Sequence, residues 1–442
     1  MKKFFIHLLF VLFALVLVFF LRSAFPKNTG FLKVFFFLLI FEVYLWYSIR
    51  SCISSMKPGR RLIITVIYWI PLAMTLGFTA YGFIVPFVVW FQPMRTHIIS
   101  FILITYLSKL WPILALIISD IIRTGQWLYI YFQSGKVKPS IPVNRKKFLL
   151  LSGWSSGIVF FLILLSGTVF GLYKFHVSEQ PIPVRGLPQS FNGFRIVQFS
   201  DVHLGSWTSK QKLEESVAII NSLNPDLIFF TGDMFNYCTA DGNGFEPILS
   251  KLKAQYGIYA ILGNHDYGDY MIWSAKKSKE QNMEDLKMFY NKLHWKLLLN
   301  THDILKKGYD SMAIIGVENW GALKRFQRAG DIDRAEKGTE NMQVQLLLSH
   351  DPSHWDSIVS RKYPNIDITF SGHTHGGQFG IDCCGIHWSP SVWFFKHWCG
   401  LYENVTSEGS QFLYVNQGLG SILYAGRVGI NPEITLITLE KR

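Results

Sequence analysis

The stretch "ITFSGHTHGGQFG", Ile368–Gly380, places two histidines two residues apart directly after a short apolar run. The run is rich in β-forming residues, and the glycines around it allow sharp turns and a close approach of the backbone. Residues i and i+2 of an extended segment point to the same side, so His373 and His375 are expected to present both imidazoles to one spot. The pattern predicts a metal site at the end of a buried strand.

Four more apolar runs end at side chains that bind metals well. Each motif alone also fits ordinary turn or capping chemistry, and a lone histidine is often a hydrogen-bonded structural residue. Together, five such motifs after five predicted strands indicate one shared site. The residues are Asp201 and His203 in "FSDVHLG", Asp233 in "FTGDMF", Asn264, His265 and Asp266 in "LGNHDYG", and His350 in "LLSHDP".

The motifs "SDVHLG", "TGD", "GNHD", "SHD" and "GHTHGGQ", in this order, resemble those of the calcineurin-like metallophosphoesterase superfamily from about Val184 to the end. The wording of "GNHDYG", "NQGLG" and "NPEITLITL" is most similar to its membrane-associated bacterial branch of predicted phosphohydrolases. The resemblance implies an α/β fold, a β-sandwich flanked by helices, with a dinuclear metal centre at the strand ends.

The resemblance also implies a role for each motif residue. Asp201, His203 and His375 would bind the first metal, Asn264, His350 and His373 the second, and Asp233 would bridge both. His265 is similar to the catalytic histidine of the family and Asp266 to the acidic residue that follows it, so the resemblance implies that both are catalytic residues.

The types of donor atom agree with this assignment. Two carboxylates, one amide and four imidazoles mix oxygen with nitrogen and include no thiolate, which suits manganese, iron or zinc. Two such ions lower the pKa of a bound water and hold phosphoryl oxygens for in-line displacement. His265, beside Asn264, is expected to protonate the leaving group or to stabilise transition-state charge.

Hydrophobicity is concentrated before about Tyr173, in five stretches that reach or approach the roughly 20 residues needed to cross a bilayer. We interpret all five as transmembrane helices that form an all-α region over residues 1–174. The first also resembles a signal peptide, but its apolar run is long and lacks a small-x-small cleavage site. The stretches are Phe4–Leu21, Phe31–Ile49, Ile63–Trp90, His97–Ser119 and Phe148–Tyr173.

The net charge of +13 is distributed unevenly. Residues 1–174 carry 18 Lys and Arg against two acidic residues, whereas residues 175–442 carry 25 against 28. With five spans, most of the first group falls on one side, so the positive-inside rule places the N-terminus in the cytoplasm and residues 175–442 outside it. An error of one span would reverse this sidedness. The slightly acidic second part disfavours a nucleic-acid partner, which requires clustered cations.

Residues 175–442 alternate apolar β-rich runs with helical patterns, which predicts one large α/β domain. The segment His176–Gly193 is rich in proline and polar residues and is interpreted as a linker or an edge strand. Five cysteines decide little. An oxidising compartment would permit a disulfide from Cys399 to Cys383 or Cys384, and the cysteines do not show the spacing of a zinc site.

Three further features have two interpretations each. Arg427 is either a contact to a substrate phosphate or part of a surface salt bridge. The aromatic stretch His387–Trp398 is either core packing with a loop or an interfacial patch on the bilayer. Lys109, inside the fourth predicted span, is either functional or a snorkelling side chain.

The sequence predicts a multi-pass membrane protein that uses two divalent ions to hydrolyse a phosphomonoester or phosphodiester, with a lipid-linked or envelope phosphate as the substrate class. One alternative is a cytoplasm-facing pyrophosphatase of sugar-nucleotide lipids. Another is a membrane sensor or transporter whose outer domain only binds a ligand, but the complete motifs argue against it. A calcineurin-type protein phosphatase is not supported, because this chain contains no recognisable docking or regulatory segment.

Overall fold

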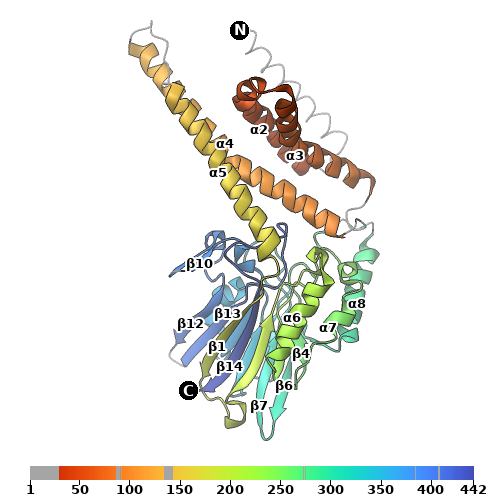
Figure 1. The fold of residues 1–442 in the computed structure, drawn as a ribbon. Coiled ribbons are helices and arrows are strands. Elements are labelled where there is room, and N and C mark those ends of the chain that lie inside the picture. Colours follow the sequence, from red (N-terminus) through yellow and green to blue (C-terminus); the bar gives the residue numbers. More distant parts are fainter. Residues whose placement is uncertain are drawn as a thin grey trace. The chain divides into compact units, whose positions relative to one another are not determined.

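The computed structural model describes residues 29–85, 90, 92–133, 143–271, 273, 275–383, 385–406 and 409–442. The chain forms two compact units, shown in Figure 1. One comprises Met1–Pro86 and Phe101–Leu162, and the other comprises Phe87–Ser100 and Ile163–Arg442.

The first unit is helical. Its helices are α2 (Thr29–Ser54), α3 (Pro58–Ile84), most of α4 (Gln92–Gln133) and α5 (Val143–Ser166), which a π-helical turn (Gly167–Gly171) continues in the second unit. Proline is tolerated as the first residue of α3 because its missing N–H has no helical partner at that position.

The prediction of five transmembrane helices is not confirmed. Among the described residues, three helical segments are long and apolar enough to cross a membrane: Pro58–Gly82, Met94–Tyr129 and Phe148–Gly171. α2 covers the predicted span Phe31–Ile49, and the predicted first span, Phe4–Leu21, lies outside the described residues.

The second unit contains two six-stranded sheets and a small hairpin. The first sheet has the order β1-β14-β2-β3-β4-β5 and the second the order β12-β13-β9-β8-β7-β6. The strands of the first sheet are β1 (His176–Val184), β2 (Phe194–Phe199), β3 (Leu227–Phe230), β4 (Ile258–Ala260), β5 (Lys296–Leu297) and β14 (Glu433–Lys441). Those of the second are β6 (Thr301–Lys307), β7 (Asp310–Gly316), β8 (Gln345–Leu348), β9 (Ile368–Ser371), β12 (Gly400–Thr406) and β13 (Gly409–Val415), and the hairpin is β10 (Ile381–Cys383) with β11 (Ile386–Trp388).

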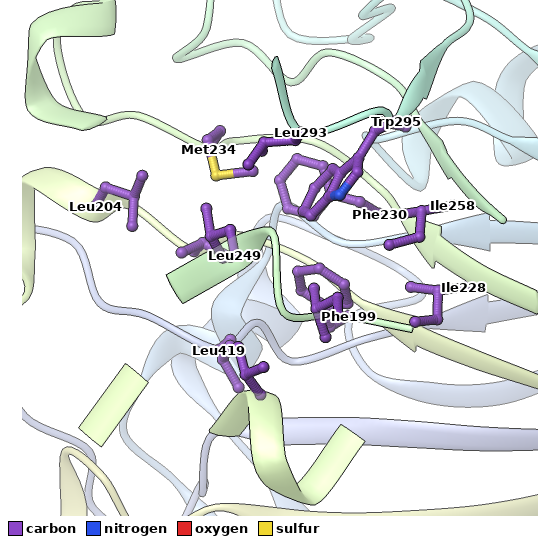
Figure 2. Close-up of a cluster of buried hydrophobic side chains, with 14 of the residues drawn as sticks. Phe199, Leu204, Ile228, Phe230, Met234, Leu249, Ile258, Leu293, Trp295 and Leu419 are labelled. Carbon is purple, nitrogen blue, oxygen red and sulfur yellow. The ribbon is translucent and has the colours of Figure 1, made fainter. Parts of the chain in front are cut away.

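Alternate residues of the strands enter different layers of the core. Phe199 of β2 and Phe230 of β3 pack with Trp295 against helices α6 (Lys210–Ser222), α7 (Glu246–Leu249) and α8 (Lys276–Lys292), as Figure 2 shows for part of this cluster. Ile196 of β2 and Phe229 of β3, whose side chains point to the other face, join the cluster that fills the space between the two sheets. Because successive side chains of a strand point to opposite faces, each of these strands contributes to two cores, as in a face-to-face sandwich.

The outer face of the second sheet is also covered. Ile315, Leu347 and Val415 pack with residues of α9 (Ile332–Glu336) and of the π-helical turn Trp355–Val359, which α10 (Ser360–Lys362) continues. With α6, α7 and α8 lying along the opposite outer face (Figure 1), the second unit is a β-sandwich flanked by helices. This confirms the predicted fold class.

The proline-rich segment after the membrane helices is an edge strand. β1 pairs in parallel with β14 and lies at the border of the first sheet. Pro181 and Pro183 lack a backbone N–H, which an edge strand tolerates because only one of its sides pairs with another strand. Among the described residues Cys383 and Cys399 are both free, so these two do not form a disulfide, and Cys384 lies outside the described residues. Cys399 Sγ instead lies 3.2 Å from His387 Nε2.

The two sheets bring parallel strands to one edge. β2, β3 and β4 run parallel in the first sheet, and β7, β8 and β9 run parallel in the second. All of the predicted metal-binding motifs follow the carboxyl ends of these strands, so the sandwich gathers them at one place.

Candidate metal centre

The backbone of the predicted ligands is unusual. Asp201, His203, Asp233, His373 and His375 all have left-handed conformations, with φ between 48° and 70°. Such φ values are uncommon for residues other than glycine and cluster at functional sites. The paired residues therefore do not converge through the alternation of an extended strand, as the spacing suggested. They converge because each motif turns sharply after its strand has ended.

The first cluster joins Asp201, His203 and His375. The Nε2 atoms of the two histidines lie 3.0 Å apart, and Asp201 Oδ1 lies 3.3 Å from His375 Nε2 and 4.0 Å from His203 Nε2. All three side chains are buried. Three ligand atoms from two distant parts of the chain thus face one point.

The second cluster joins Asp233, His350 and His373. Asp233 Oδ2 lies 3.3 Å from His350 Nε2, and His350 Nε2 lies 3.3 Å from His373 Nδ1. The same Asp233 oxygen lies 3.5 Å from His203 Nε2 of the first cluster. One carboxylate therefore contacts both clusters.

Asn264 follows β4 at the edge of the second cluster. Its side-chain N–H donates to the Tyr270 hydroxyl at 2.8 Å, whereas its buried Oδ1 has no hydrogen-bond partner among the described residues. The backbone N–H of His265 donates to Asp233 Oδ1 at 2.8 Å, which holds this loop against the cluster.

The residues present fit a pair of divalent ions. Asp201 Oδ1 and Asn264 Oδ1 are buried acceptors without partners in the described structure, and such atoms are costly unless a donor or a cation satisfies them. The donors at the two clusters are oxygen and imidazole nitrogen only, the set that manganese, iron and zinc accept.

Burial sets the protonation of the histidines. It lowers the pKa of His203 to about 3 and that of His373 to about 4, and it also lowers the pKa of His375. These rings are therefore neutral at pH 7, the form that binds metals. His350 differs, because the carboxylates of Asp233 and Asp201 outweigh its burial and raise its pKa to about 10. The two carboxylates thus stabilise positive charge at His350, a charge that a bound divalent ion would supply in place of the proton.

His265 lies beside both clusters and is only partly buried. Its Nδ1 lies 2.8 Å from the Asn236 carbonyl oxygen, so Nδ1 carries a proton and donates it there. Its ring stacks on Tyr270 at 4.2 Å and meets the edge of the His203 ring at 4.9 Å. Nε2 is the nitrogen left for a reacting group.

Asp266 points away from this space. Its carboxylate accepts hydrogen bonds from four backbone N–H groups, those of Asp233, Met234, Phe235 and Gly263. The side chain is 1% exposed. Asp266 therefore joins the loops after β3 and β4, a position that favours support of the site over contact with a substrate.

The structure excludes a surface salt bridge for Arg427, because the residue is 2% exposed. Contact with a substrate phosphate stays a prediction, which this burial does not favour. The guanidinium of Arg427 donates to backbone carbonyls, among them those of His375, Gln417 and Gly420. It fixes the loop after β13 behind the first cluster.

Three neighbours of His373 were not identified from the sequence. Asp351 Oδ2 lies 3.6 Å from His373 Nε2, on the opposite side of the ring from the cluster. Phe326 and Phe395 meet the ring edge-on at 4.7 and 5.4 Å. The "SHDP" motif contained the signal for Asp351, which directly follows His350, and Phe395 belongs to the aromatic stretch His387–Trp398, but nothing in the local sequence indicated Phe326.

The sandwich with two adjoining ligand clusters is the fold of a metallophosphoesterase. Comparison with known families agrees: residues 194–377 match the calcineurin-like phosphoesterase family. Residues 28–172 match the family described as a probable calcineurin-like phosphoesterase transmembrane domain. The chain belongs to the calcineurin-like phosphoesterase family and is a membrane protein.

Two relatives illustrate the similarity. The chain is 30% identical over 296 residues to a transmembrane protein with metallophosphoesterase domain from Danio rerio, covering 63% of this chain and 62% of that protein. It is 30% identical over 271 residues to the uncharacterized metallophosphoesterase YkuE of Bacillus subtilis, covering 61% of this chain and 86% of that protein. Among solved structures, Haemophilus influenzae NAD nucleotidase aligns with a TM-score of 0.36 and 15% identity over 52% of this chain and 45% of that chain, which adds nothing to the assignment.

Proposed function

We propose that this protein is a membrane-anchored phosphohydrolase that binds two divalent ions and cleaves a phosphoester bond. The observation that carries the proposal is the position of Asp233, whose Oδ2 lies within 3.5 Å of a histidine from each cluster. A carboxylate shared between two ligand sets is the arrangement that a dinuclear centre requires. Asp201, His203 and His375 would hold one ion, and Asn264, His350 and His373 the other.

The chemistry divides between the ions and the chain. When bound, two divalent ions activate water and withdraw charge from the phosphoryl oxygens. His265 supplies what they do not: with Nδ1 donating to Asn236, Nε2 is the nitrogen left for proton transfer to the leaving oxygen. Tyr270, stacked on the ring, restricts its rotation.

The substrate class that we propose is a lipid-linked or envelope phosphoester. Phe395 and Phe326 give the second cluster an apolar side, and the neighbouring Trp393 and Phe394 are 71% and 66% exposed. Large exposed aromatic side chains are favoured at a membrane interface. In the same segment Trp398 is buried, so the core interpretation applies to that residue, and the membrane interpretation is part of this proposal for Trp393 and Phe394 only.

The sidedness that we propose does not depend on residues 1–28. Cations flank the connection between α2 and α3 and the sequence between α4 and α5, which the positive-inside rule places in the cytoplasm. α5 then crosses once, so the phosphoesterase domain, which we assign to residues 175–442, lies outside. Removing the first predicted span moves only the N-terminus. Labelling of intact cells with an impermeant maleimide tests this in variants that keep one cysteine each, the others being replaced by serine. The exposed Cys383 should react when it is the one retained, and Ser55→Cys in a background without native cysteines should not.

The experiment that tests the activity uses the full chain, purified in detergent, stripped with chelator and reloaded separately with manganese, iron and zinc. Three substrates distinguish phosphoester hydrolysis from the alternatives: p-nitrophenyl phosphate, bis-p-nitrophenyl phosphate and a lipid-linked pyrophosphate. We expect metal-dependent turnover that Asp233→Asn abolishes. Preference for the pyrophosphate would favour the lipid pyrophosphatase alternative. Bound metal without turnover on any substrate would favour the sensor alternative.

A further inference from the structure

The first unit contains a cleft of about 780 Å³ that the phosphoesterase chemistry does not use. α3 and α5 line it along with α4, and so do Cys52 in the last turn of α2 and Met56, which follows α2. Nearly all of the lining is apolar; the polar groups come from Thr105, Ser108 and Lys109 of α4, from the hydroxyl of Tyr68 and from the indole N–H of Trp154. We call this feature the α3–α5 cleft.

The α3–α5 cleft opens at the surface of the helices. Ile67 of α3 and Leu151 and Ile158 of α5 line it and are 62%, 64% and 58% exposed. These residues belong to segments that are apolar and long enough to cross a membrane. At such a surface the surroundings are hydrocarbon, so the occupant that the lining favours is a lipid chain rather than water.

The buried side of the cleft offers hydrogen-bond donors without partners. Thr105 is 8% exposed, and its Oγ1 has no hydrogen-bond partner among the described residues. The buried Nε1 of Trp154 has none either. Lys109 differs, because its Nζ is paired with Glu42 Oε1 at 2.5 Å and lies over the Tyr68 ring. With that charge balanced, the cleft presents neutral donors that match an uncharged acceptor such as an ester carbonyl.

The position of the cleft along the helices agrees with such a ligand. It involves the end of α2, the first half of α3 and the middle of α5, with residues from Ile49 to Met56, from Ile64 to Pro71 and from Leu150 to Phe161. The exposed Lys57 stands in the connection between α2 and α3, and the exposed Arg60 and Arg61 lie in the first turn of α3. Cations at the end of a membrane helix attract lipid phosphates.

From these observations we infer that the α3–α5 cleft binds a membrane phospholipid. One acyl chain lies between α3 and α5, its ester carbonyl accepts hydrogen bonds from Trp154 and Thr105, and its phosphate faces Lys57, Arg60 and Arg61. This inference does not rest on the proposed hydrolytic activity, since it concerns other residues and a ligand that is not cleaved there.

Photolabelling tests the occupant. The full chain in nanodiscs receives phosphatidylcholine that carries a diazirine in one acyl chain, and the labelled peptides are identified by mass spectrometry. We expect labels to concentrate on the segments that line the cleft. Ile158→Trp and Ile67→Trp should each reduce this labelling strongly, because the indole fills the cleft. Equal labelling of all exposed helix faces, or labelling unchanged by both variants, would overturn the inference.

Matched controls separate filling of the cleft from a general effect of tryptophan. Val159→Trp and Val66→Trp alter the adjacent residues, which are 56% and 48% exposed but do not line the cleft. Both should leave the labelling unchanged. A monodisperse elution profile and an unaltered melting temperature establish that each variant is folded.

The recognition of the ester is tested with an ether-linked photolipid that lacks the carbonyl. We expect the normal chain to prefer the ester lipid by about threefold to tenfold, the worth of one or two hydrogen bonds, and Trp154→Phe or Thr105→Val to lose the preference. Equal labelling by both lipids in the normal chain would refute the proposed role of these donors. Photocrosslinks from position 158 to residues 1–28 in place of lipid would show that the chain itself fills the cleft and would overturn the inference.

Discussion

The carboxylate of Asp266 accepts a hydrogen bond from the backbone N–H of Asp233, with a donor–acceptor distance of 2.9 Å. Three more backbone N–H groups bond to the same carboxylate, two from the loop after β3 and one, that of Gly263, from the loop after β4. The residue that contacts both ligand clusters is therefore held in place by its neighbour in the "GNHD" motif. Asp266 acts on the site through backbone geometry.

Asp266→Asn is expected to lower stability by about 1–3 kcal/mol and to weaken metal binding. The new amide nitrogen would face N–H donors, which leaves them buried without acceptors. Thermal unfolding and the metal content of the purified chain measure both effects. Asp269→Asn, a nearby exposed residue, is the control and should change neither. Normal stability and metal content with lost turnover would instead make Asp266 a catalytic residue, as the sequence suggested.

His265→Ala is expected to keep both metals and to lose about 10²- to 10⁴-fold in kcat, because only proton transfer to the leaving group is removed. Measuring kcat together with metal content separates this role from a structural one. The exposed His294→Asn controls for loss of a histidine as such. Retained turnover in His265→Ala would exclude the acid role.

Asp351→Asn is expected to reduce affinity for one of the two metals by about 10- to 100-fold. Its carboxylate lies 3.6 Å from His373 Nε2 and orients the ring whose Nδ1 faces His350, and such outer partners of histidine ligands typically contribute that much. Metal titration of the stripped protein measures the change. Asp356→Asn is the matched control, since its carboxylate contacts the remote His397 at 2.8 Å. If the affinities for both metals stayed unchanged in Asp351→Asn, this role of Asp351 would be contradicted.

Arg95→Met is expected to destabilise the second unit by about 3–5 kcal/mol. Arg95 belongs to that unit and bonds Asp241 at 2.6 Å, with the two side chains only 3% and 2% exposed, so removing it leaves a buried charge unpaired. Thermal unfolding measures the effect. Adding Asp241→Asn should recover part of the loss, whereas Lys212→Met, in an exposed pair with Glu215, should cost at most about 1 kcal/mol. Equal effects of the two single changes would argue against an important buried pair.

Arg95 also bears on His265. Asp241 accepts the backbone N–H of Tyr237, which directly follows the Asn236 carbonyl that binds His265 Nδ1. We therefore expect Arg95→Met to lower kcat at temperatures where the protein remains folded. An unchanged kcat would show that the Arg95–Asp241 ion pair does not affect the orientation of His265.

Most of the second unit was predictable because its signals are local. Each long apolar run became a strand, and "KQKLEESVAIINS" became α6, which Ser209 caps with its side chain. Strands with little apolar character, such as β5 and the hairpin of β10 and β11, were not predicted. Their pairing depends on neighbours distant in the sequence, which period-2 patterns do not reveal.

The amino-acid sequence by itself determined where the apolar strands lie along the chain, which residue types follow them and the membrane character of the first 174 residues. Each of these is a property of a short contiguous segment. The tertiary structure decided how the ligand residues meet: left-handed turns after parallel strands of two sheets aim Asp201, His203 and His375 at one point. It also decided that Asp266 and Arg427 support the backbone, because their partners are amides and carbonyls of loops that only folding brings together.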